Sequence, residues 1–281
     1  MTLRRTLKSR VLFVLVRLFL VVYAFAIIYP IFWIVMMSLK PNNQIFQNIW
    51  GLPQTWAFNN YVRAWEASKV GSHFFNSVFV TIASNIVILL TCIPLSYTLG
   101  RFKFRGRGAI KAIIVSGLLL PSMTGLLGQY IFLLRMKLAN THTGLILVYL
   151  AVSIAFTVFM LSNYFASVPS EFEESARLDG CGYWRTLWLI VVPMVRNGIV
   201  MVTVLNVLST WNEYTIALTV LTDQSKRTIA VGVAGMLKAQ TNYTDWGALF
   251  AAVVILMMMS FLIYIAFQRK IIDHVTLGGV K

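Results

Sequence analysis

Two parts of this sequence combine residue types and spacings that could recognise a ligand or a partner. The first is a polar group inside an apolar stretch, made of Asn206, Asn212 and Glu213. Their amide and carboxylate groups suit the hydroxyl groups of a polar solute. An ionisable side chain inside a bilayer costs at least about 2.5 kcal/mol, so it normally faces protein or water. These residues therefore either line a solute pathway or form hydrogen bonds between packed helices, and the sequence leaves both interpretations open.

The second part is the polar segment 169–193, PSEFEESARLDGCGYWRTLWLIVVP, which separates two apolar stretches. Ser170 and Glu173 have the spacing of a capping box, in which each side chain satisfies a free amide of the first helical turn. Asp179 and Gly180 should end this first helix, since glycine is the usual left-handed residue at a helix terminus. A second helix is expected from about 183 to 192, because a residue before Pro193 is disfavoured in a helix.

One face of the first predicted helix is small and carries a single aromatic side chain. Phe172, Ser175 and Ala176 are three to four residues apart and fall on this face. Such a face could enter a groove on a partner protein, or it could belong to an ordinary amphipathic connector at the membrane surface. Glu173 can also pair with Arg177 four residues later. The spacing of these residues does not distinguish a helix that docks on a partner protein from one that only connects two spans.

The sequence lacks the residue patterns that several kinds of chemistry require. No G-x-x-x-x-G-K-[ST] loop is present to hold the phosphates of a nucleotide, and no Ser/His/Asp or Cys/His group has a recognisable context. The two cysteines and three histidines show no metal-ligand spacing. We therefore expect a chain that is not an enzyme, that binds no metal or cofactor itself, and that takes energy for transport from a partner or an ion gradient.

Composition makes lipid the solvent for much of the chain. Of 281 residues, 58% are hydrophobic and only 12% are charged, with a mean hydropathy of +0.76. Soluble domains carry about a quarter charged residues. The net charge of +15 does not indicate a nucleic-acid partner, because the basic residues flank apolar runs and form no patch with interleaved aromatics.

Six apolar stretches are long enough to cross a hydrocarbon core, which takes about 20 residues. The sequence therefore predicts an all-α membrane protein with six transmembrane helices, in which residues 1–281 form a single membrane domain. The spans are expected at about 11–37, 73–100, 108–128, 144–166, 197–220 and 246–267.

The distribution of lysine and arginine predicts the orientation. Sixteen of the 24 lie on the side shared by both termini, the 101–111 loop and the 169–196 loop. Because cytoplasmic loops carry the excess of positive charge, both termini should be cytoplasmic. The N-terminal Arg4, Arg5, Lys8 and Arg10 precede an apolar run that is too long for a secretory signal, so we expect an uncleaved first span.

The segment EFEESARLDG, followed by VVP, resembles the EAA loop of ABC importer permeases, which reads Glu-Ala-Ala, three residues, Gly and, further on, Leu-Pro. Ser175 and Val192 are the two departures from that pattern. In that family the loop docks into a cleft on the nucleotide-binding subunit. The resemblance implies an EAA-type coupling helix pair in the cytosol between spans 4 and 5, with the ATPase-coupling residues Phe172, Glu173, Glu174, Ser175, Ala176, Asp179, Gly180 and Pro193.

Three further segments resemble the carbohydrate-uptake branch, and the likeness to the six-span partner in maltose-type heterodimers covers essentially the whole chain. They are LANTHTGLIL at 138–147, STWNEY at 209–214 and TLGGVK at 276–281. The resemblance implies a permease subunit of the bacterial inner membrane that forms half of a sugar or oligosaccharide pathway, with Asn206, Asn212 and Glu213 as candidate pathway residues. It also implies a second homologous permease, a dimer of ATP-binding subunits that hold ATP and Mg, and an extracytoplasmic solute-binding protein.

Two other functions fit part of this pattern. An ABC importer permease for another solute, such as glycerol phosphate or a polyamine, would share the loop. An ion-coupled secondary transporter usually shows internal repeats and broken intramembrane helices, and no repeat is visible in this sequence.

Overall fold

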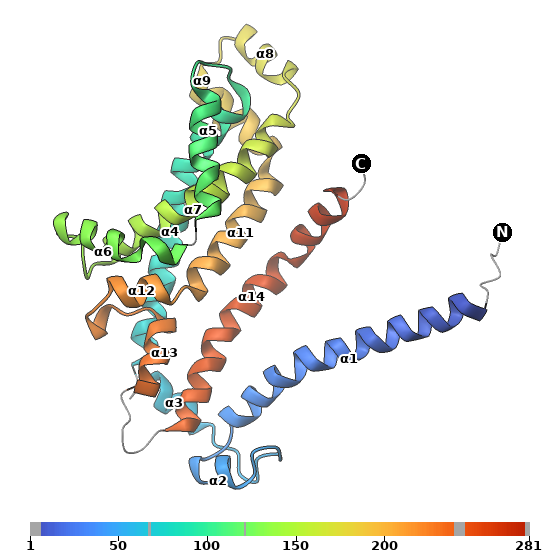
Figure 1. Cartoon of the computed structure of the whole chain (residues 1–281), viewed down its shortest axis with the longest axis vertical. Coiled ribbons are helices and arrows are strands. Elements are labelled where there is room, and N and C mark those ends of the chain that lie inside the picture. Colours follow the sequence, from blue (N-terminus) through green and yellow to red (C-terminus); the bar gives the residue numbers. More distant parts are fainter. Residues whose placement is uncertain (1–6, 67–68, 121, 239–244, 279–281) are drawn as a thin grey trace. The chain divides into compact units, whose positions relative to one another are not determined.

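The computed structural model of the chain describes residues 7–66, 69–120, 122–238 and 245–278 (Figure 1). Within these ranges the regular elements are helices and no strand occurs, so the all-α prediction is confirmed for them. Arg4 and Arg5 of the N-terminal basic segment lie outside the described residues, as do the last three residues of the TLGGVK segment.

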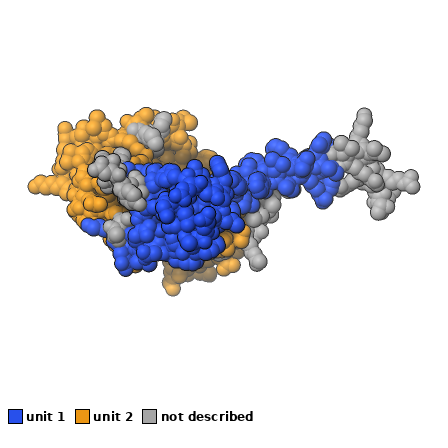
Figure 2. Space-filling model, turned by 90° about the horizontal axis from the view of Figure 1, so that it is seen from below, with its two compact units in different colours: residues 1–70, 236–255 blue, residues 71–235, 256–281 orange. Residues whose placement is uncertain are grey.

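The chain divides into two compact units, shown in different colours in Figure 2. The first consists of residues 1–70 and 236–255, and the second of residues 71–235 and 256–281. The first unit contains α1 (Leu7–Ser38), α2 (Asn42–Gln47), α3 (Asn59–Trp65) and the start of α14 (Trp246–Gly278). The side chains of α1 from 12 to 30 are exposed and mostly apolar, a surface that suits lipid.

A polar network ties the start of α14 to α2 and α3 in the first unit. Asp245 accepts hydrogen bonds from Arg63 Nε at 2.8 Å and from Asn42 Nδ2 at 3.1 Å. Burial raises the pKa of Asp245, but the hydrogen bonds from Arg63, from the Ala248 amide and from Asn42 outweigh burial and hold the pKa below its ordinary value. The carboxylate therefore stays ionised at neutral pH and fastens these three segments together.

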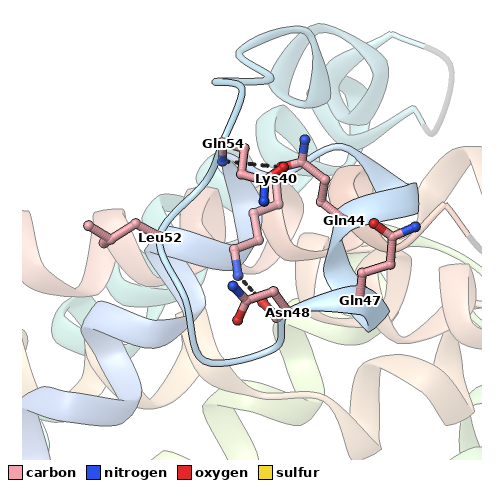
Figure 3. Close-up of a pocket in the computed structure, with 6 residues that line it drawn as sticks. All are labelled: Lys40, Gln44, Gln47, Asn48, Leu52 and Gln54. Atoms are coloured by element: carbon pink, nitrogen blue, oxygen red, sulfur yellow. Dashed lines mark hydrogen bonds between the residues drawn. The ribbon is translucent and has the colours of Figure 1, made fainter.

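A small polar cavity lies beside Lys40, whose side chain is 1% exposed (Figure 3). Lys40 Nζ donates a hydrogen bond of 2.6 Å to the main-chain oxygen of Asn48. Burial lowers the pKa of this ammonium group, because the low dielectric disfavours the charged form. The cavity has a volume of about 20 Å³, enough for one water molecule. Its lining residues are Lys40, Gln44, Gln47, Asn48, Leu52 and Gln54.

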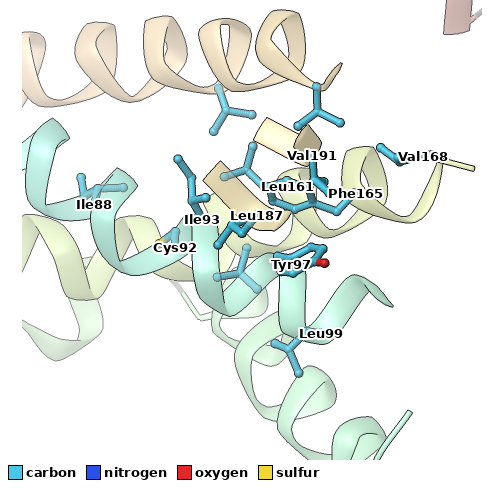
Figure 4. Close-up of a cluster of buried hydrophobic side chains, with 13 residues drawn as sticks. Ile88, Cys92, Ile93, Tyr97, Leu99, Leu161, Phe165, Val168, Leu187 and Val191 are labelled. Atoms are coloured by element: carbon cyan, nitrogen blue, oxygen red, sulfur yellow. The ribbon is translucent and has the colours of Figure 1, made fainter. Parts of the chain in front are cut away.

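The second unit is built on two long helices, α4 (Val70–Arg101) and α7 (His142–Ala166), with α11 (Arg196–Asn212) beside α7. Its main apolar cluster joins α4 and α7 to the π-helical segment Leu187–Val191, through side chains such as Tyr97, Phe165 and Leu187 (Figure 4). A second cluster contains Val80, Leu133, Tyr149 and Ile216. The shorter elements are α5 (Arg107–Ser116), α6 (Leu126–Arg135), α8 (Glu171–Leu178), α9 (Tyr183–Thr186), α10 (Val192–Met194), α12 (Thr215–Val220) and α13 (Ile229–Lys238).

Four helices among the described residues are long and apolar enough to cross a bilayer. They are α1, α4, α7 and α14, which correspond to the first, second, fourth and sixth predicted spans. A fifth crossing results if the helical run Tyr183–Met194 and α11, which meet at an angle of 82°, are taken as one bent span.

The third predicted span is not one helix. We expected a continuous helix over 108–128, but α5 ends at Ser116 and is followed by 3₁₀ turns at Gly117–Leu119 and Ser122–Gly125 before α6 begins. The sequence GLLLPSMTG explains the interruption, because proline lacks the amide that continues a helix and glycine lowers helix propensity. A prediction based only on the length of the apolar stretch could not detect this break.

The fifth predicted span also ends early. We expected a helix from 197 to 220, but α11 stops at Asn212 and Glu213 adopts an extended conformation with ψ of 130°. A separate short helix, α12, follows from Thr215. Prediction of one uninterrupted helix was wrong here because the Glu213 side chain bonds to the main-chain amides of the next helix.

Candidate functional site

The first helix of the 169–193 segment forms where the sequence predicts it and ends as predicted. α8 spans Glu171–Leu178, and Gly180 beyond it has a φ of +77°, in the left-handed region that favours glycine. The predicted capping box is wrong, since Ser170 makes no side-chain cap bond. The amides of Glu173 and Glu174 bond instead to the main-chain oxygen of Ser170, each at 3.0 Å.

Glu173 points into the protein and binds the end of α4. Its Oε1 lies 2.9 Å from Arg101 Nε, and the two side chains are only 8% and 12% exposed. The same guanidinium donates through Nη1 to the main-chain oxygen of Val168 at 2.7 Å. The expected pairing of Glu173 with Arg177 is therefore replaced by a contact across 72 residues of sequence. The spacing of residues within the 169–193 segment could not predict this ion pair, because Arg101 lies outside the segment.

The second helix of the segment is longer than predicted and changes its winding. α9 leads into the π-helical segment Leu187–Val191, and α10 continues through Pro193 to Met194. The prediction of a stop before Pro193 was wrong. The wider π turn, whose closing bond runs from the Val192 amide to the Leu187 oxygen, accommodates a proline that cannot donate. The turn to α11 then comes at Val195.

Only part of the predicted docking face is accessible. Phe172 is 48% exposed and Ser175 is also exposed, whereas Ala176 is buried against the rest of the second unit. Leu178, at 90% exposure, extends the accessible face by a further turn. Sequence reasoning missed Leu178, although its spacing of three residues from Ser175 could have revealed it. Glu174, Asp179, Gly180 and Pro193 are exposed as well.

The three intramembrane polar residues do not converge on one site. Asn206 is buried and donates to Thr157 Oγ1 of α7 at 2.9 Å. Asn212 is exposed and contacts Ser260 Oγ of α14 at 3.3 Å. Three separate environments therefore replace the single polar group that the sequence suggested.

Glu213 closes the break between α11 and α12. Its Oε1 accepts from the Ile216 amide at 2.7 Å, and its Oε2 accepts from the Ala217 amide at 2.9 Å and from the Tyr149 hydroxyl at 2.9 Å. The carboxylate thus satisfies two amides at the start of α12 and ties them to α7. This geometry stabilises a helix terminus.

The fold and this segment define the class of the protein, which is an all-helical membrane protein with a short exposed helix, α8, between the apolar helices α7 and α11. Residues 92–275 match the family of the binding-protein-dependent transport system inner membrane component, and the chain belongs to that family. It is therefore a multi-pass transport component of the inner membrane.

Relatives and a solved structure resemble nearly the whole chain. The diacetylchitobiose uptake system permease protein NgcG of Streptomyces coelicolor is 35% identical, over 93% of this chain and 87% of the relative. The melibiose/raffinose/stachyose import permease protein MelC of Bacillus subtilis is 27% identical, over 90% and 91%. The fold matches the crystal structure of a bacterial ABC transporter involved in the import of the acidic polysaccharide alginate, with a TM-score of 0.86, 22% identity and coverage of 94% and 98%. The chain is the permease subunit of an ABC importer.

Proposed function

We propose that this permease carries a sugar or oligosaccharide. The supporting observation is its likeness, over about nine-tenths of its length, to permeases named for diacetylchitobiose and for melibiose, raffinose and stachyose. The chemistry of Asn212 agrees with such a substrate. Its exposed amide, with Ser260 Oγ at 3.3 Å, offers donors and acceptors without a net charge. We assign Asn212 to the pathway, and Asn206 and Glu213 to the support of the helices around it.

A transport measurement tests the substrate class. The complex would be reconstituted in liposomes with its solute-binding protein and supplied with diacetylchitobiose, raffinose, putrescine or glycerol 3-phosphate. Sugar-dependent ATP hydrolysis and uptake support the proposal. Uptake of putrescine or glycerol 3-phosphate with no response to either sugar would contradict it.

We also propose that the ATP-hydrolysing subunits dock on the exposed face of α8. Phe172, Ser175 and Leu178 form this docking face, and an apolar knob flanked by a small side chain suits a groove on a partner. The exposed Glu174, Asp179 and Gly180 border it. ATP and Mg would then be held by those subunits. In this proposal the partner subunits bind and hydrolyse the nucleotide, and this chain supplies the docking face.

The topology that follows from this docking has six crossings with both termini in the cytoplasm. α1, α4, α7 and α14 supply four of them, the helices around the 82° bend supply a fifth, and the broken α5–α6 stretch supplies the third in chain order. We propose that residues 1–281 act as one membrane domain beside a second, homologous permease. A pair of ATP-binding subunits and an extracytoplasmic solute-binding protein complete the importer.

Replacing an exposed apolar side chain with a charge tests the docking face. Leu178→Asp should abolish copurification of the ATPase subunits, because Leu178 is 90% exposed and contributes little to the fold. Phe104→Asp is the matched control, since Phe104 is 41% exposed in the neighbouring 102–106 loop and lies outside the docking face. Undiminished copurification with Leu178→Asp would refute docking at α8.

A further inference from the structure

Both helices of the 169–193 segment are bonded to the same short stretch of α4. Glu173 of α8 forms the buried ion pair with Arg101. The hydroxyl of Tyr183, the first residue of α9, lies 2.9 Å from Thr98 Oγ1 and donates to the Pro94 oxygen at 3.3 Å. The last two turns of α4 therefore hold the coupling segment through directional hydrogen bonds and an ion pair, whose side chains are largely shielded from water.

Aromatic packing and main-chain caps stiffen this junction. The Tyr183 ring centroid lies 5.3 Å from that of Tyr97 and 5.8 Å from that of Phe102. Arg107 donates from Nε to the main-chain oxygen of Leu99 at 3.0 Å, which satisfies a carbonyl at the end of α4. Figure 4 shows Tyr97, on α4, close to Phe165 of α7 and to the π-helical segment. The end of α4 thus behaves as part of a packed core.

The covalent connections of the coupling segment to α7 and α11 are not continuous helices. Four residues, 167–170, link α7 to α8 without a complete helical turn. On the other side the chain turns through 82° at Val195 before α11 begins. Non-helical linkers and sharp bends absorb backbone rotation, as hinges do. A displacement of α8 and α9 would therefore be transmitted to α4 more directly than to α7 or α11, the long helices that precede and follow the coupling segment in the sequence.

The opposite end of α4 is bonded just as specifically. His73 Nε2 donates to the Gln224 oxygen at 3.0 Å, and Asn76 Nδ2 donates to the Ser225 oxygen at 2.9 Å. The Ile229 amide donates to Ser77 Oγ at 2.8 Å. With a rise of about 1.5 Å per residue, the 32 residues of α4 span about 48 Å, which exceeds the bilayer core. α4 therefore links the coupling segment to the segment before α13 on the other side.

We propose that α4 is the helix through which movement of the coupling segment enters the membrane, and that Arg101 and Glu173 are the positioning residues that make this connection. The proposal rests on docking of the ATPase subunits at α8. Arg101 and Glu173 themselves face inward and lie outside that docking face. Loss of the connection should therefore leave the subunits bound while α4 no longer responds to them.

The informative variant removes both charges. Arg101→Met alone leaves Glu173 buried without its counter-ion, which destabilises the fold and confuses the result. Replacing a buried pair by apolar side chains is often neutral for stability, so Arg101→Met/Glu173→Leu should fold. Arg105→Met is the matched control, because Arg105 is exposed in the 102–106 loop that directly follows α4.

Spin labels would report the movement in the assembled complex, in a background carrying Cys181→Ser, since Cys92 is buried. Labels at Leu90→Cys on α4 and Val152→Cys on α7 use exposed positions. With the connection intact, adding ATP and vanadate should change the distance between the labels by about 2 Å or more, the scale of helix shifts in switching proteins. The Arg105→Met control should behave in the same way.

The double variant should copurify with the ATPase subunits and show no change in that distance. A change equal to that of the control would overturn the proposal, as would an unchanged distance in the chain with both charges present. Failure of the unaltered permease to retain the ATPase subunits would instead refute docking at α8.

Discussion

Glu213→Gln separates a helix-capping role from a solute-pathway role for this residue. The carboxylate accepts three hydrogen bonds, from the Ile216 and Ala217 amides and from the Tyr149 hydroxyl. A glutamine has one acceptor oxygen, and its amino group would face a donor. At least one charge-assisted bond is lost, so the expected destabilisation is about 1.5–3 kcal/mol.

The assay combines thermal unfolding in detergent with hydrogen exchange at α12. Glu213→Gln should lower the unfolding temperature by several degrees and speed exchange of the Ile216 and Ala217 amides, since both lose an acceptor or its charge. Tyr149→Phe is the matched comparison, because it removes one donor and leaves both amides paired. It should therefore cost less stability and leave amide exchange nearly unchanged.

One result would refute this reasoning. If Glu213→Gln unfolded at the original temperature, kept slow exchange at α12 and still lost sugar uptake, the carboxylate would act on the solute and not on the helix. Asn212→Ala provides the contrasting case. Asn212 is exposed, so its truncation should reduce uptake with little effect on unfolding.

Three other expectations follow from the geometry. The pKa of Asp245 is lowered, so the contribution of this carboxylate to stability is complete at neutral pH. That contribution is lost as the pH falls below about 4, through the pKa of the folded state. Acid unfolding curves should show this loss in the original chain and lack it in Asp245→Asn. Gly180→Ala should cost about 1–2 kcal/mol in thermal unfolding, because φ is +77° there. In Gly198→Ala the new Cβ would lie 2.6 Å from the Tyr164 ring, so overpacking between α11 and α7 should lower the unfolding free energy by about 1–3 kcal/mol, and an unchanged value would contradict the observed packing.

Features set by local sequence were predictable. The long apolar runs of α1, α4, α7 and α14 required only length and composition. The end of α8 two residues before Gly180 was predictable from the preference of glycine for positive φ. In contrast, the expected helix over 108–128 failed because apolar character outweighed the helix-breaking effect of GLLLPSMTG in the prediction.

The candidate site depended more on contacts between distant residues. From the sequence Arg101 is one of the positive charges of the 101–111 loop that predict the orientation, whereas in the structure it pairs with Glu173 of another helix. Glu213 was recognised as unusual inside an apolar stretch, but its role depends on Tyr149, 64 residues away. Spacing within one helix contains no information about such partners, so the residues were identified and their functions were not.

The π-helical segment Leu187–Val191 also determines the angular phase of α9. A π turn contains one residue more than an α turn, and each residue turns a helix by about 100°. If the same residues were wound as an α-helix, Tyr183 would be rotated by about that angle away from Thr98. The wider turn therefore acts as a rotational offset, which accommodates one extra residue and keeps Tyr183 directed at Thr98.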